Sequence, residues 1–367
     1  MKRIANIFTV LLAAGLFFSA CTSDDDNKFE RDETTFGCYI VNYGSFGNLG
    51  ASITRYDYKA DTVTNGYFER QNNGFELLSN IQYANVYNGS IYMMGNERDE
   101  VITTNLLFQQ TENGISEGIA KPRFFVGNGD YIYVSCWGSN PDWGDMVDTY
   151  IAKIDTRTNE VVEKIDLPGG PEGLAIANGH LYAALNFRKQ VAVIDLNDYE
   201  SITYIETPGV TSYFIKDASN NLYVTLLSSF TQDVEDTGMG YINTATKTLE
   251  EVYSLDGISS SYGSVISPNN DFSTIYVIAA SWVEVEGKWE QQGGVFSFDV
   301  ASKSYSPFIS NLSGMGGVMV NPDTDEIYLL TSSSTSESGK LNVYNEDGTF
   351  IKDIQVGRSP AWAFFMK

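Results

Sequence analysis

The feature that most constrains the fold is a repeat of short strand-like segments, each running into an Asp or Asn that opens a polar turn. Consecutive copies are 40 to 56 residues apart, at Asp57, Asn105, Asp155, Asp195, Asn243, Asp299 and Asn345. An Ile or Leu followed by Tyr stands between consecutive copies. A period near 40 to 50 residues built only from short strands is typical of a β-propeller with one four-stranded blade per repeat. Because one blade cannot bury its own faces, the copies must stack into a ring.

The best preserved copy, residues 173–205, shows how one blade is built. Its Asn178-Gly179 pair separates two strand-length runs, and Asp195 opens a later turn. Asn-Gly tolerates the positive φ angles of a tight hairpin, and an Asp side chain bonds backbone N–H groups two residues on. Runs of four to six residues are strands rather than helices. No segment after residue 20 has a sustained helical period, so we expect an all-β domain.

Counting the repeats predicts seven blades closed into a circle. Six blades are expected at 78–115, 121–167, 171–206, 210–256, 262–309 and 313–356. Three strands remain before them and one after them, at Cys38–Tyr43, Ile53–Asp57, Thr62–Phe68 and Ala361–Met366. Three strands plus one complete a seventh blade that the two ends of the chain share, which leaves no free edge strand. A β-sandwich or a solenoid of similar spacing is the alternative.

The N-terminus predicts export. Lys2 and Arg3 precede an apolar stretch, residues 4–18, which is too short for a comfortable membrane span and is typical of a secretory signal. Small residues then lead into Cys21. This pattern resembles a bacterial lipoprotein signal, with residues 1–20 removed and Cys21 lipidated. Ordinary cleavage after Ala20 is the alternative.

The residues after Cys21 predict a flexible tether and a cellular location. Residues 21–35 are polar and apolar-poor, so we expect a flexible acidic linker that leaves 36–367 for the propeller. The triplet Asp24-Asp25-Asp26 resembles the signal that sends Bacteroidetes lipoproteins to the outer face of the outer membrane. We therefore expect a protein that is exposed outside the cell and held to the membrane by lipid alone. A plain solvated linker is the alternative reading of the triplet.

Composition argues against several function classes. The chain has 23 Lys and Arg against 47 Asp and Glu, a net charge of −24 that opposes nucleic acid and anionic ligands. The single His, His180, falls at a hairpin turn, so neither a His-based catalytic relay nor a His-based metal site is expected. The acidic run 233–236 lacks the ligand spacing of a dedicated Ca²⁺ loop. We therefore expect a binding protein with no catalytic residues, metal or cofactor.

Two further cysteines, Cys38 and Cys136, fall in blades that are not neighbours. We expect two free, half-buried thiols rather than a disulfide, although an exported protein would permit one.

The aromatic residues indicate a binding face. In a propeller, the loops between second and third strands emerge on the same face as the blade-to-blade connections. All five Trp are expected there, with Trp137, Trp143, Trp282 and Trp289 in long loops and Trp362 at a blade entry. Aromatic residues in exposed loops usually mark a ligand surface. The alternative is that some of them only pin long loops to the ring.

The blade entries are expected to line the central mouth, because Pro fixes φ where the chain turns inward and the next residue faces the axis. The resulting mixture of polar and aromatic groups suits a large, neutral, amide-rich or hydroxyl-rich ligand. The predicted ligand-binding residues are Arg123, Trp137, Trp143, Glu172, Arg188, Tyr213, Tyr262, Trp282 and Trp362.

Several motifs resemble those of the YncE-like seven-bladed propellers. They are the entries Pro122-Arg123-Phe124-Phe125 and Pro171-Glu172-Gly173-Leu174, and the opening segment 39–47. The opening is similar to that of Bacteroidetes surface lipoproteins of the BtuG group. Over residues 36–367, the resemblance implies non-enzymatic capture of cobalamin and its transfer to a TonB-dependent outer-membrane transporter. Glycan binding or a scaffold role in a surface layer is the alternative, and a propeller hydrolase or lactonase is disfavoured by the lone His.

Overall fold

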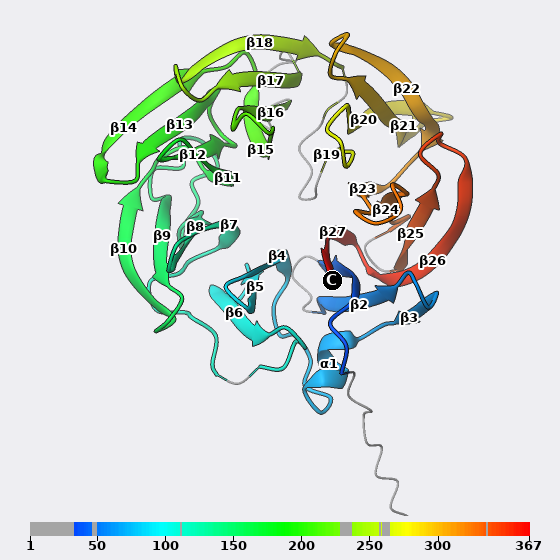
Figure 1. Cartoon of the computed structure of the whole chain (residues 1–367), viewed down its shortest axis with the longest axis horizontal. Coiled ribbons are helices and arrows are strands. Elements are labelled where there is room, and N and C mark those ends of the chain that lie inside the picture. Colours follow the sequence, from blue (N-terminus) through cyan, green and yellow to red (C-terminus); the bar gives the residue numbers. More distant parts are fainter. Residues whose placement is uncertain are drawn as a thin grey trace, which may run out of the picture.

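Seven antiparallel sheets stand around a common axis in the computed structural model (Figure 1). The structure describes residues 33–45, 50–110, 112–227, 237–256, 258, 265–334 and 337–367. The innermost strand of each blade contacts the innermost strands of the two neighbouring blades, from β4 through β27 and back to β4. The predicted seven-bladed propeller is therefore confirmed.

Blade one combines the two ends of the chain in the order β27 (Pro360–Met366), β1 (Gly37–Asn42), β2 (Ser52–Asp57) and β3 (Thr62–Thr64). Blade two has β4 (Ile81–Tyr87), β5 (Ser90–Gly95) and β6 (Glu100–Asn105). Blade three has β7 (Pro122–Asn128), β8 (Tyr131–Cys136), β9 (Tyr150–Asp155) and β10 (Glu160–Asp166). Blade four has β11 (Pro171–Ala177), β12 (His180–Leu185), β13 (Gln190–Asp195) and β14 (Asp198–Glu206).

Blade five has β15 (Val210–Lys216), β16 (Leu222–Leu227), β17 (Gly238–Asn243) and β18 (Thr248–Ser254). Blade six has β19 (Ile266–Pro268), β20 (Thr274–Val285), β21 (Lys288–Asp299) and β22 (Ser304–Leu312). Blade seven has β23 (Met315–Val320), β24 (Ile327–Thr331), β25 (Ser338–Tyr344) and β26 (Phe350–Arg358). The helix in the described residues is the short α1 (Tyr67–Gln71), and it is not long enough to cross a membrane.

The two ends of the chain meet in blade one as expected. β27 pairs antiparallel with β1, in register from Gly37 opposite Met366 to Val41 opposite Trp362. Phe364 from β27 stacks on Tyr39 from β1, with ring centroids 5.6 Å apart. Both side chains are buried. The strand that closes the ring therefore also contributes to its core.

The core lies between neighbouring blades, because each sheet is buried on both faces. The Tyr residues of the repeated Ile-Tyr or Leu-Tyr pairs fill these interfaces. Tyr92, Tyr182 and Tyr328 are almost completely buried. Tyr328, for example, packs with Cys38 and Ile40 across the junction of blades seven and one. The repeated pair is thus a packing signal.

Blade two departs from the predicted four strands. Its outer strand is reduced to a single bridge between Val101 and Ile115. The side chain of Asn105 accepts hydrogen bonds from the backbone N–H groups of Leu107 and Gln109, and this turn carries Phe108 into the core. Phe108 packs against Tyr39, and the segment after β6 that carries it does not pair with β6 as a fourth strand.

Two predicted segments have other structures. The strand expected over 62–68 ends at Thr64, since Gly66 takes a left-handed φ of 62° and α1 follows. A left-handed residue interrupts a strand, and Gly adopts it at little cost. The segment that carries Trp282 and Trp289, expected to be a long loop, is a hairpin in which β20 and β21 continue pairing as far as Val285 and Lys288.

The two cysteines of the described chain, Cys38 and Cys136, are free, as predicted, but they are fully buried rather than half-buried. Burial raises the pKa of the Cys136 thiol to about 12 and also raises that of Cys38. Both side chains therefore act as small apolar groups in the core. The predicted signal peptide 1–20 and Cys21 lie outside the described residues.

Closure of the ring predicts that Phe364→Ala destabilises the protein far more than Phe350→Ala. Phe364 is 5% exposed in β27, whereas Phe350 is 53% exposed in β26. Removing a buried Phe side chain costs about 3–5 kcal/mol, and an exposed one costs about 0.5 kcal/mol. Urea denaturation monitored by Trp fluorescence measures both free energies of unfolding. Equal midpoints for the two variants would show that β27 is dispensable.

Candidate ligand-binding surface

The blade entries direct side chains from one blade toward the next. In blades three and four, the pairing of the first two strands shifts register just after the entry, between Pro122 and Phe125 and between Pro171 and Leu174. The same shift follows Ile81 in blade two and Thr211 in blade five. A bulge of this kind re-aims a side chain. The side chain after the entry Pro therefore does not follow the alternating side-chain directions of a regular strand.

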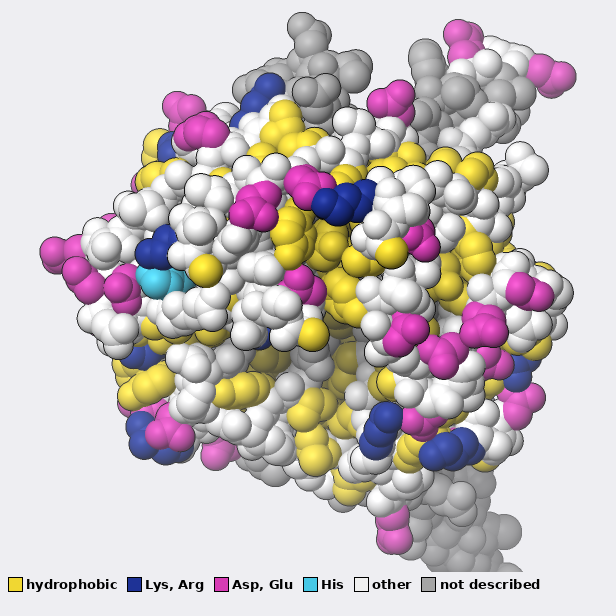
Figure 2. Space-filling view, turned by 45° about the horizontal axis from the view of Figure 1, so that its top comes forward, with side chains coloured by type: hydrophobic (Ala, Val, Ile, Leu, Met, Phe, Trp, Pro, Cys, Tyr) yellow, Lys and Arg dark blue, Asp and Glu magenta, His cyan; other side chains and the backbone are white. Residues whose placement is uncertain are grey.

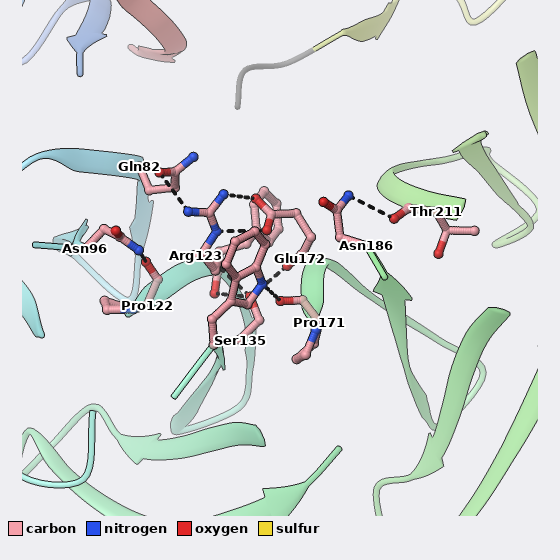
Figure 3. Close-up of polar contacts among 11 residues, drawn as sticks. Gln82, Asn96, Pro122, Arg123, Ser135, Pro171, Glu172, Asn186 and Thr211 are labelled. Atoms are coloured by element: carbon pink, nitrogen blue, oxygen red, sulfur yellow. Dashed lines mark hydrogen bonds and ion pairs between the residues drawn. The ribbon is translucent and has the colours of Figure 1, made fainter. Parts of the chain in front are cut away.

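Arg123 and Glu172 occupy these positions in blades three and four and bond to each other (Figure 3). Nε and Nη2 of Arg123 donate to the two carboxylate oxygens of Glu172, at 2.8 and 3.0 Å. Nη1 donates to Oε1 of Gln82 in blade two, at 3.1 Å. The Arg and Glu side chains are only about 4% exposed. The polar residues predicted to contact a ligand thus join three blades to one another.

In blades two, three and four, the residue that follows the second strand donates a side-chain hydrogen bond to the next blade. Asn96 donates to the carbonyl oxygen of Pro122 at 3.5 Å, and Asn186 donates to that of Thr211 at 3.3 Å (Figure 3). Trp137 occupies the corresponding place in blade three, where its Nε1 donates to the carbonyl oxygen of Pro171 at 3.1 Å. An indole therefore replaces an amide at one of three equivalent junctions.

Trp137 links the buried ion pair to an aromatic surface. The Arg123 guanidinium lies 3.9 Å from the centroid of the buried Trp137 ring, a cation–π contact. Trp143 and Phe187 pack edge-on to the same indole, with centroids 6.0 and 5.4 Å away. Trp143 is 56% exposed, and nearby Val147 is similarly exposed. Trp137, Trp143 and Phe187 form what we call the aromatic surface.

The loop that presents Trp143 is held at several points. The Asp142 carboxylate accepts hydrogen bonds from the N–H groups of Gly144 and Met146, and these bonds lower its pKa. The turn therefore keeps its charged acceptor at neutral pH and loses it only in acid, as the pH falls through the lowered pKa. The carbonyl oxygen of Met146 accepts from Gly169 N–H. A loop fixed in this way loses less conformational entropy when it binds a ligand.

Arg188 lies beside the same surface. It follows Phe187, and its aliphatic stem is so close to Gly169 that a Cβ there would come within 2.8 Å of it. Gly169 also has a φ of 113°, which other residues rarely adopt. Five predicted residues therefore gather at the junction of blades three and four: Arg123, Trp137, Trp143, Glu172 and Arg188.

Tyr213 and Trp362 belong to a second aromatic group, which meets at the axis. Phe124 from blade three lies 6.3 Å from Tyr213 in blade five and 6.2 Å from Trp362 in blade one. Tyr83 from blade two packs on both Phe124 and Trp362, at 3.9 and 4.6 Å. Rings from four blades thus meet across the centre. Within the described residues, Nε1 of Trp362 is buried and has no hydrogen-bond partner.

The remaining predicted positions fall outside what the structure describes. Tyr262 and the acidic run 233–236 are not among the described residues. Trp282 and Trp289 lie on the paired strands of the blade six hairpin, but their side chains are not described. Among the described side chains, no three His, Cys, Asp or Glu residues gather as metal ligands would. Figure 2 shows acidic side chains spread over the face in view rather than collected in one patch.

Sequence reasoning missed Phe187, Phe124 and Gln82. Phe187 follows Asn186, which holds the junction position that Trp137 fills in blade three. Gln82 and Phe124 lie in the same entry segments as Tyr83 and Arg123. Aligning the repeats on their second strands would have revealed these equivalent positions. It would not have shown which of them touch.

A family model described as a domain of unknown function, DUF5074, matches residues 36–366. The chain belongs to the DUF5074 family. No curated protein matches it significantly.

Solved structures share the fold of this DUF5074 chain at low identity. A quinonprotein alcohol dehydrogenase-like protein from Bacteroides thetaiotaomicron is 18% identical, with a TM-score of 0.64 over 90% of this chain and 78% of that one. Hydrazine synthase from Kuenenia stuttgartiensis is 12% identical, with a TM-score of 0.61 over 75% and 85% of the two chains. A functionally unknown protein from Desulfotomaculum acetoxidans is 13% identical, with a TM-score of 0.60 over 90% and 98%. These similarities show the fold alone.

The buried pair predicts an asymmetric mutational result in the DUF5074 chain. Arg123→Met leaves the Glu172 carboxylate buried without its partner and should cost about 3–5 kcal/mol, whereas adding Glu172→Met should restore most of that stability. Chemical denaturation of wild type, both single variants and the double variant measures the coupling. An Arg123→Met protein within about 0.5 kcal/mol of wild type would contradict a structural role for the pair.

Proposed function

We propose that this DUF5074 propeller is a non-enzymatic capture protein that binds a cobalamin-sized corrinoid at its aromatic surface. The observation that carries the proposal is Trp143, a large apolar side chain that is 56% exposed and packs on two further aromatic rings. Contiguous exposed apolar area usually marks a ligand or partner site, and Trp143 continues into the half-buried ring of Phe187. The resemblance to the BtuG group supplies the ligand class.

The chemistry of the surface suits a large neutral ligand. The net charge of −24 disfavours an anion. The buried charges of Arg123 and Glu172 satisfy each other, so they hold the base of the surface rather than contact the ligand. Contact then falls to Trp143, to the edge of Phe187 and to the half-buried Arg188. Aromatic and Arg anchors of this kind carry most of the energy of an interface.

The proposed setting is the outer face of the outer membrane. Cys21 would carry the lipid, residues 21–35 would form the tether, and a TonB-dependent transporter would receive the ligand. The lipoprotein pattern at Ser19-Ala20-Cys21 supports the anchor. Neither nucleic acid nor a catalytic cofactor has a place in this proposal.

A Trp143→Ala variant should bind cyanocobalamin at least about thirty-fold more weakly than wild type, because an aromatic anchor contributes about 2 kcal/mol or more. Its melting temperature should stay unchanged, since Trp143 is exposed. Phe350→Ala, which removes an exposed ring from β26, is the matched control and should bind normally. Isothermal titration calorimetry measures all three affinities.

The same titration separates the alternatives. No heat from cyanocobalamin, together with heat from neutral oligosaccharides that Trp143→Ala abolishes, would replace the corrinoid proposal with glycan binding at this surface. No heat from either ligand would favour a protein partner, as in a surface-layer scaffold. Corrinoid binding that survives Trp143→Ala would leave the function standing and show that the surface is wrong.

The anchor has its own test. Wild-type protein should enter the detergent phase on partitioning and be shaved from intact cells by protease, whereas Cys21→Ala should do neither because it lacks the acyl chains. A Cys21→Ala protein that still sediments with membranes would refute lipidation at this residue.

A further inference from the structure

A second surface feature lies at the outer rim between blades one and two, where blade two lacks its outer strand (Figure 1). An open cleft of about 660 Å³ is found there, between α1 with its following turn and the segment after β6. Its walls carry six amide side chains: Gln71, Asn72, Asn73, Gln109, Gln110 and Asn113. The cleft shares none of its lining residues with the aromatic surface.

Amide side chains are enriched in the lining of this cleft relative to the whole chain. Asn and Gln are 37 of the 367 residues of the chain, but they are six of the eight residues that line the cleft. Each amide offers both hydrogen-bond donors and acceptors and carries no charge. A hydroxyl group also donates and accepts, so these walls match a polyhydroxylated neutral ligand better than an ion.

The remaining two lining residues sharpen the match. Phe75 is 74% exposed, more than any other large hydrophobic side chain in the described part of the chain. A ring at the wall of a polar cleft offers an apolar platform of the size of a pyranose C–H face. Glu112 is the one charged lining residue, and its carboxylate accepts from Nδ2 of Asn159 at 3.3 Å.

The two walls of the cleft are joined by Asn72. Its Nδ2 donates to the carbonyl oxygens of Phe68 at 2.7 Å and Phe108 at 2.8 Å, and its Oδ1 accepts from the N–H of Gln110 at 2.9 Å. The turn that carries Phe75 is bonded to α1, through Gly74 N–H to the carbonyl oxygen of Glu69. A site whose walls are already positioned loses little entropy on binding.

We propose that this amide-lined cleft binds a neutral saccharide, with one sugar ring stacked on Phe75 and its hydroxyls bonded by the exposed amides of Asn73, Gln110 and Asn113. The site is independent of the corrinoid proposal, because it lies on different blades and uses different residues. The propeller would then bind neutral glycan at the cleft while the aromatic surface remains available to a corrinoid.

The test is calorimetry of the whole propeller with neutral oligosaccharides of glucose, mannose, xylose and galactose, with a galacturonic acid oligomer as the charged comparison. Binding of at least one neutral oligomer is expected, with little binding of the charged one. Phe75→Ala should weaken it about thirty-fold, and Gln110→Ala about five- to ten-fold. Both variants should melt like wild type, since Phe75 is exposed and only the backbone of Gln110 is used in the fold.

Two controls keep the sites apart. Val162→Ala removes an exposed apolar side chain from β10, and Trp143→Ala removes the aromatic anchor, so both should leave saccharide binding unchanged. If no neutral oligosaccharide binds at millimolar concentration, the proposal is wrong. It is also wrong if saccharide binding survives Phe75→Ala, and loss of that binding in Trp143→Ala would then place the glycan at the aromatic surface. Neither result bears on cyanocobalamin binding, which is measured separately.

Discussion

The pairing of β27 with β1 is the constraint on which the rest of the structure depends. Each blade buries both of its faces against neighbours, so an open ring would expose two apolar faces and two strand edges. The last strand of the chain closes the first blade, in unbroken register from Gly37 to Val41, and it places Phe364 on Tyr39. The positions of the blade entries around the axis follow from this closure, because the inner strands touch in an unbroken circle.

Within that circle, the position after the second strand of a blade carries different side chains in different blades. The residue after the second strand donates a side-chain hydrogen bond to the next blade in blades two, three and four. Asn fills this role twice with a small amide, and Trp137 fills it with an indole large enough to stack on Arg123 and to support Trp143 and Phe187. Trp137 therefore both bonds blade three to blade four and supports the exposed aromatic surface. Such a surface is rigid because its innermost member is part of the scaffold.

Both proposed binding features lie where the repeat is broken. The aromatic surface uses the long connection between β8 and β9, and the amide-lined cleft occupies the place of the missing fourth strand of blade two. Side chains at regular blade positions pack in the core, as the buried Tyr of each repeat shows. Side chains of irregular segments do not have to fill the core. They are therefore the natural positions for ligand contacts on a propeller.

The sequence by itself determined the number of blades and the closure of the ring, because these depend on the period of the repeat and on the strands left over at the two ends. It also indicated Arg123, Trp137, Trp143 and Glu172, since entry motifs and loop aromatics are local signals. Only the tertiary structure decided that Arg123 and Glu172 bond each other and that Phe108 replaces a strand by burying its ring. Those outcomes depend on contacts between residues 49 and 69 positions apart, and a local pattern does not show which distant partner neutralises a charge or fills a gap.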